Sequence, residues 1–97
     1  MAKLVLKLEE DYGKGILVEE DDKKGIEELA GKGFLDLSSF IDEARKHHVY
    51  VQRNLSYYGS TDVDELPFEL KELEVFYTNP FSRGSNSYYV GKVKVSE

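Results

Sequence analysis

The chain has 97 residues, a net charge of −6 and no cysteine. The lack of cysteine excludes disulfides, thiol nucleophiles and thiolate metal sites. The acidic balance argues against a general binder of nucleic acid or anionic membranes, because both need positive potential. The sequence contains no stretch with the apolar length of a membrane span or the pattern of a secretory signal. We therefore expect a single cytoplasmic domain over residues 1–97, with no cofactor.

The N-terminal third predicts a hairpin followed by a short helix. Leucines alternate with other residues over 2–9, which is typical of a half-buried strand, and the apolar run 16–18 predicts a return strand after an acidic turn. Further along, apolar residues spaced by three and four predict one or two helical turns. Asp22 is the expected N-cap of that helix, and Gly31 is expected to end it.

The middle of the chain predicts a longer helix and a third strand. From Leu37 to Ala44, apolar residues recur at i, i+3, i+4 and i+7, which is the stripe of a helix lying on a sheet. Asp36 is the expected N-cap of this helix. Alternation over 49–55 predicts a strand, and the acidic stretch 62–71, interrupted by a proline, predicts a loop or ragged edge.

The last third predicts a hairpin of strands at 72–78 and 88–95. We expect Glu74 to face Lys92, because opposite charges and aromatic or β-branched partners then face one another along the whole pair. A slip by one residue would place lysines against the core. In this register the inner face carries Leu73, Val75, Tyr77, Tyr89, Gly91 and Val93, and the outer face carries Glu72, Glu74, Phe76, Tyr88, Val90, Lys92 and Lys94.

The order of elements predicts the fold class. The sequence reads β-β-α-α-β-β-β, which favours an α+β fold with a mainly antiparallel sheet of about five strands and both helices packed on one face. The opening order, a hairpin and then a helix, also suits a ubiquitin-like β-grasp arrangement.

Two surface features predict a protein-binding site. Phe76, Tyr88 and Val90 form an apolar group on the outer face of the last hairpin. This group is a contact surface unless a neighbouring element covers it. The acidic run 62–74 is either a solvated edge or a docking surface for a basic protein, since such fields select partners. We interpret the chain as a small acidic, non-enzymatic interaction module, such as an inhibitor, immunity-type or adaptor protein; the apolar face could instead form a homodimer. The predicted site residues are Asp62, Asp64, Glu65, Glu69, Glu72, Glu74, Phe76, Arg83, Tyr88 and Val90.

An alternative is a nucleic-acid or phosphate-ligand binder that uses the basic and aromatic residues between 45 and 58. Phosphate contacts combined with stacking bind single strands, although the overall negative charge opposes this interpretation. The residues of this cluster are Arg45, Lys46, His48, Tyr50, Arg53, Tyr57 and Tyr58.

A further alternative is a small enzyme that uses His47 or His48 as a general base. A histidine that faces a pocket with a carboxylate in reach would favour it. The sequence has no HExxH spacing, phosphate-binding loop motif or calcium-binding loop, so we expect no metal site.

Overall fold

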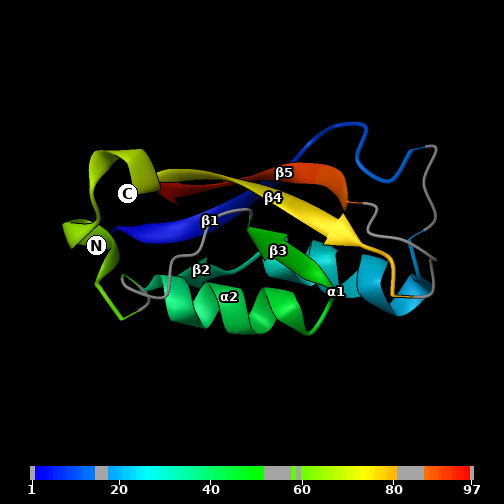
Figure 1. Ribbon diagram of the computed structural model, residues 1–97, viewed down its shortest axis with the longest axis horizontal. Helices are drawn as coiled ribbons and strands as arrows, with labels where there is room; N and C mark the ends of the chain where they lie inside the picture. Colours follow the sequence, from blue (N-terminus) through cyan, green and yellow to red (C-terminus); the bar gives the residue numbers. More distant parts are fainter. Residues whose placement is uncertain (1, 15–17, 52–57, 59, 81–86, 97) are drawn as a thin grey trace.

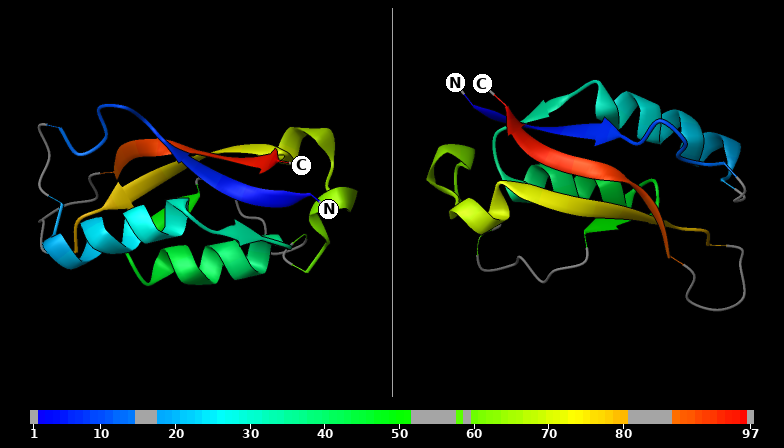
Figure 2. Two further views of the ribbon diagram at one scale, coloured as in Figure 1. Left: turned by 180° about the vertical axis from the view of Figure 1, so that it is seen from behind. Right: turned by 90° about the horizontal axis from the view of Figure 1, so that it is seen from above.

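The computed structural model describes residues 2–14, 18–51, 58, 60–80 and 87–96. The protein has an α+β fold in which a five-stranded antiparallel sheet is covered on one face by two helices (Figure 1; Figure 2). The strand order is β2-β1-β5-β4-β3. The predicted fold class is confirmed.

Among the described residues, helices and strands follow one another in the order β-α-β-α-β-β-β, and the short 3-10 helices η2 and η3 precede the last two strands. This differs from the predicted order, because the strand beside β1 comes after the first helix instead of before it. The strands are β1 (Lys3–Leu8), β2 (Gly33–Phe34), β3 (Val49–Val51), β4 (Glu72–Thr78) and β5 (Ser87–Ser96), and the helices are α1 (Glu20–Ala30), α2 (Leu37–Arg45), η2 (Val63–Glu65) and η3 (Phe68–Leu70).

The predicted N-terminal hairpin is wrong at the positions that the structure describes. In the expected hairpin Leu6 of the first strand would face Val18 of the return strand. In the structure Leu6 pairs with Val93 of β5, and Val18 lies outside any strand. On its other side β1 pairs with β2, at Leu4 and Phe34. Residues 15–17 of the expected return strand lie outside the described residues. Because α1 precedes β2, the hairpin-then-helix opening of a β-grasp arrangement is not present among the described elements.

Both predicted helices are present, and two of the three capping residues predicted from the sequence are correct. Asp36 caps α2 as predicted, since its Oδ1 accepts a hydrogen bond from the backbone N–H of Ser39 at 2.8 Å. Gly31 ends α1 as predicted, but the N-cap of α1 is Glu19. Asp22 lies inside the first turn of α1, where it is buried.

The core lies between the helices and the inner face of the sheet. Phe40 of α2 is fully buried and meets Phe34 of β2 edge to face, with ring centroids 5.5 Å apart. Burial of each large apolar side chain contributes about 1.5–3 kcal/mol. The buried apolar residues of the three long strands are Leu4 and Leu6 of β1, Leu73, Val75 and Tyr77 of β4, and Val90 and Val93 of β5.

The register of the last hairpin is as predicted over its first half and shifted over its second half. Glu72 faces Lys94, and Glu74 faces Lys92. A β-bulge between Val75 and Phe76 then inserts an extra residue on β5. Beyond the bulge the facing pairs are Phe76 and Tyr89, Tyr77 and Tyr88, and Thr78 and Ser87.

The bulge reverses the predicted orientation of three side chains. Val90 was expected on the outer face, but it is fully buried. Tyr88 was also expected outside, but it faces inward and packs against the core. Tyr89 was expected inside, but it pairs with Phe76 on the outer face. The predicted apolar group of Phe76, Tyr88 and Val90 therefore does not exist as such.

Candidate functional site

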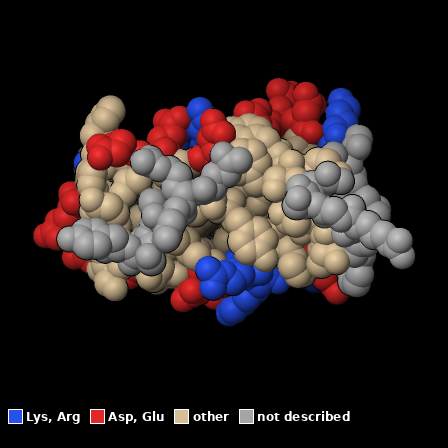
Figure 3. All heavy atoms as spheres, viewed as in Figure 1, with Lys and Arg blue, Asp and Glu red and all other residues tan. Residues whose placement is uncertain are grey.

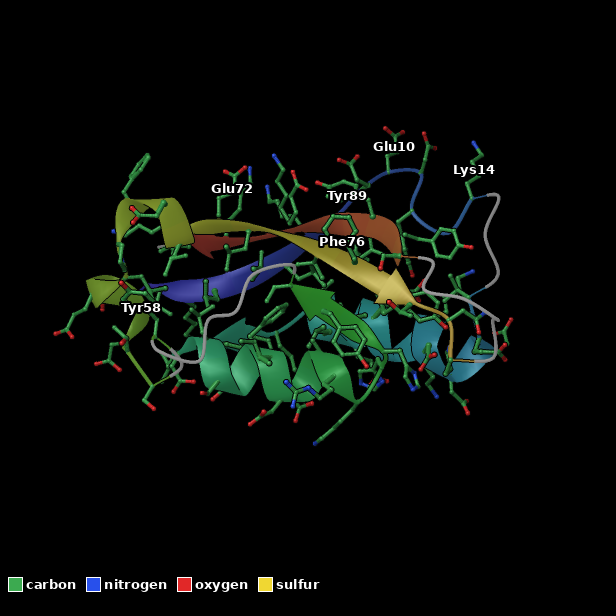
Figure 4. The ribbon with its side chains drawn as sticks, in the orientation of Figure 1. Glu10, Lys14, Tyr58, Glu72, Phe76 and Tyr89 are labelled. Carbon is green, nitrogen blue, oxygen red and sulfur yellow. The ribbon has the colours of Figure 1, made fainter. Side chains whose placement is uncertain are left out.

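The outer face of the sheet carries a row of three aromatic side chains. Tyr50 of β3 lies beside Phe76 of β4, and Phe76 lies beside Tyr89 of β5. The rings of Phe76 and Tyr89 meet edge to face, with centroids 5.7 Å apart. Figure 4 shows both residues on the side of the sheet away from the helices. Tyr50 is 41% exposed, so this row replaces the predicted apolar group.

Charged side chains on the same face form a ladder next to the aromatic row. Nζ of Lys92 lies 2.9 Å from Oε1 of Glu72, and Nζ of Lys94 lies 3.7 Å from its Oε2. The hydrogen bond and the charge of Lys92 lower the pKa of Glu72, and the same contact raises the pKa of Lys92. The negative charge of Glu72 is therefore compensated within the chain, while Glu74 faces Lys92 on the neighbouring strand.

The other part of the acidic run lies at one end of the molecule, on η2 and η3. This acidic end consists of Asp62, Asp64, Glu65, Glu69 and Phe68. All four carboxylates are exposed, and none has an ion pair among the residues that the structure describes. Figure 3 shows acidic side chains along the sheet side and at this end, with a group of basic side chains on the helix side. The predicted acidic surface thus splits into a compensated and an uncompensated part.

Phe68 projects from the acidic end. Its side chain is 88% exposed, whereas Leu66 and Leu70 on either side are buried and anchor the segment in the core. The backbone N–H of Val63 also donates to the carbonyl of Leu35 at 3.0 Å, which fixes η2 to the body of the domain. An open pocket of about 350 Å³ lies beside Phe68 and is lined by Phe68, Glu69, Lys71 and Glu72.

A buried network at the start of α1 was not predicted. The Tyr77 hydroxyl donates to Oδ2 of Asp22 at 2.8 Å, and Nδ1 of His48 lies 3.0 Å from the same oxygen. Because a carboxylate only accepts, Nδ1 carries a hydrogen and Nε2 of a neutral ring is left as an acceptor. His48 has a φ of 60°, a left-handed conformation that costs a non-glycine residue roughly 1–2 kcal/mol. The contact with Asp22 helps to offset that cost.

His48 and Asp22 also line an open pocket of about 370 Å³, with Glu19, Glu20, Asp21 and Pro80. A histidine with a carboxylate in reach is one requirement for general-base catalysis. The hydroxyl of Tyr77 donates to Asp22, so this network does not place a nucleophile against the imidazole. His47 points elsewhere and covers Gly25 of α1, where even a methyl group would collide with its ring. The two adjacent histidines therefore fasten the end of α2 to α1.

Alkaline titration can reveal the network. Burial and, next, the hydrogen bond to Asp22 raise the pKa of Tyr77 from its ordinary value of 10.0 to about 12. The folded state holds this proton more strongly, so its contribution to stability is complete below pH 10 and is lost as the pH rises toward 12. We expect the free energy of unfolding to fall less over this range in Tyr77→Phe than in the wild type, measured by urea denaturation. Equal pH dependence in both proteins would contradict the raised pKa.

The structure places the described members of the predicted nucleic-acid cluster on different sides of the molecule. Tyr50 lies on the outer sheet face, His48 turns toward α1, and Tyr58 is half-buried against the core. Arg45 and Lys46 are exposed at the end of α2, where Lys46 pairs with Glu43 at 3.1 Å. Arg53 and Tyr57, and Arg83 of the predicted protein-binding site, lie outside the described residues.

The described ranges contain neither a metal-binding cluster nor a membrane-spanning helix. Over residues 2–14, 18–51, 58, 60–80 and 87–96, no group of three or more potential ligands could hold a metal ion. No helix in these ranges has the length and apolar character needed to cross a membrane. The fold and surfaces define a small α+β domain with an aromatic row on the outer sheet face and an acidic end. No protein-family model, curated protein or solved structure matches the chain.

Proposed function

We propose that this protein is a non-enzymatic interaction module, of the inhibitor, immunity or adaptor type, that binds a basic protein through its acidic end. The observation that carries the proposal is the 88% exposure of Phe68 among carboxylates that have no ion pair among the described residues. An aromatic side chain surrounded by charge of one sign is suited to a complementary protein surface.

The charge distribution supports a basic partner. Glu72 is compensated by Lys92 and Lys94, whereas the carboxylates of the acidic end have no ion pair among the residues that the structure describes. Uncompensated carboxylates on one end attract lysine and arginine side chains and raise the rate of association with a protein of opposite charge. Such binding weakens as the salt concentration rises.

The position of Phe68 supports an anchoring role. Leu66 and Leu70 already bury the apolar side of the segment, so folding does not need Phe68. Its transfer into a pocket of the partner would contribute about 1.5–3 kcal/mol. Aromatic anchors of this kind dominate interface energies.

A binding comparison tests the proposal. A partner is first isolated with the immobilised wild-type chain and identified, and its affinity is then measured by calorimetry against Phe68→Ala and Glu65→Gln/Glu69→Gln. We expect at least about a tenfold loss for Phe68→Ala, since a hot-spot truncation costs about 2 kcal/mol. The glutamine variant should bind more slowly and with less dependence on salt.

The matched control is Phe76→Ala, which removes an aromatic side chain from the sheet face instead. It should leave the affinity for this partner unchanged. A partner that binds Phe68→Ala and the glutamine variant as tightly as the wild type would show that the acidic end is not the site.

A further inference from the structure

The outer sheet face has a charge pattern that is complementary to itself. β4 presents Glu72, Glu74 and Phe76 in succession, and β5 presents their facing partners Lys94, Lys92 and Tyr89. One strand thus carries the carboxylates, and its neighbour carries the ammonium groups. Each strand also contributes one ring to the aromatic row. A surface of this kind matches a rotated copy of itself if β4 of one copy lies over β5 of the other.

We propose that this face joins two copies of the chain in a two-fold symmetric dimer. The symmetry axis runs parallel to the strands, above the line between β4 and β5. Rotation about this axis keeps each residue at its level along the strands and exchanges β4 with β5. Glu74 of one protomer then lies over Lys92 of the other, and Phe76 lies over Tyr89. Two sheets packed face to face in this way form an aligned sandwich.

Two neighbouring positions of an axis parallel to the strands bring like charges together. An axis directly above β4 would place Glu74 over Glu74, and one directly above β5 would place Lys92 over Lys92. Like charges in contact across an interface cost several kcal/mol. Of these three parallel axes, the proposed one makes both the charges and the rings complementary, so the pattern also selects against the other two.

The face also has the apolar centre that a dimer needs. It is seen full-on in the right panel of Figure 2. In the dimer, four rings from Phe76 and Tyr89 would form this centre, with the Glu/Lys pairs on one side and Thr78 and Ser87 on the other. An apolar centre with a polar rim is the usual anatomy of an interface.

A charge-exchange experiment tests the dimer by sedimentation equilibrium of the whole chain. The wild type should sediment as a dimer. Glu74→Lys places lysine over lysine at both symmetric contacts, and Lys92→Glu places glutamate over glutamate, so each variant alone should be monomeric. In an equimolar mixture of the two variants, every contact again joins opposite charges, and the dimer should return.

Each outcome decides the question. A monomeric wild type, single variants that remain dimeric, or a mixture that stays monomeric would overturn the proposal. Circular dichroism verifies that the single variants fold. If either does not, Phe76→Ser takes its place and must dissociate the dimer. Phe68→Ala must leave the dimer intact, because Phe68 lies at the acidic end and outside the dimer face. The dimer proposal and the proposed function therefore fail independently of each other.

Discussion

Replacement of Gly91 by alanine is expected to lower the free energy of unfolding by about 4 kcal/mol, the combined cost of a strained backbone and an overpacked contact. A Cβ at this position would lie 2.1 Å from the carbonyl oxygen of Lys7 and 2.9 Å from Cα of Leu8. Both atoms belong to the backbone of β1, so no side-chain rotation can relieve the collision. Gly91 also has a φ of 156°, which L-residues rarely adopt.

Gly33→Ala is the matched control. A Cβ there would approach Cδ of Lys3 to 2.6 Å, but this atom belongs to a flexible side chain that can move away. We expect less than about 1 kcal/mol for this variant, as for most surface substitutions. Thermal denaturation measures both: a loss of about 4 kcal/mol lowers Tm by roughly 15–30 °C in a domain of this size. Similar midpoints for the two variants would refute the close approach of β1 and β5.

The sequence was sufficient to predict half of the last hairpin because its information there is redundant. Glu72, Glu74, Lys92 and Lys94 agree on one register, and the alternation of apolar residues agrees with the charges. Beyond the bulge no pair of opposite charges fixes the register. Tyr88, Tyr89 and Val90 are consecutive residues that all suit a strand, so no pattern among them indicates which residue is the extra one. Gly91 was the available signal, since glycine within a strand often marks a bulge.

The N-terminal pairing could not be predicted for a different reason. β2 consists of only Gly33 and Phe34, and its pairing with β1 spans the whole of α1. Periodicity needs several residues to show itself, so two residues carry no signal. The sequence analysis paired the first strand with the next apolar run along the chain. In the structure the first strand pairs with the more distant β2 and β5.

The candidate sites also include features that the sequence predicts and features that depend on tertiary contacts. The acidic run could be read directly from composition, but its compensation by Lys92 and Lys94 depends on tertiary pairing. Phe68 was hidden in a stretch assigned to a loop, although Leu66 and Leu70 on either side already indicated that both could be buried while Phe68 faced out. The contact of Asp22 with His48 joins residues far apart in the sequence, and no local sequence motif indicates it.

Asp22→Ala is expected to cost about 2–3 kcal/mol of unfolding free energy, since a hydrogen bond to a charged group contributes about 1.5–3 kcal/mol and an orphaned buried donor is costly. The carboxylate of Asp22 is the acceptor for the fully buried Tyr77 and the partner of His48. Asp21→Ala is the control, because Asp21 is an exposed carboxylate in the same first turn of α1. It should lose only the favourable charge at the helix N-terminus, about 0.3–1 kcal/mol.

A double-mutant cycle with Tyr77→Phe separates the network from the helix. In the Tyr77→Phe background the buried hydroxyl is absent, so removal of Asp22 no longer leaves that hydroxyl without an acceptor. We expect Asp22→Ala to cost at least about 1 kcal/mol less in this background than in the wild type, within the range of coupling energies between contacting residues. Urea denaturation at neutral pH supplies all four values. Strictly additive effects would mean that the hydrogen bond between Asp22 and Tyr77, which joins α1 to β4, contributes nothing to stability.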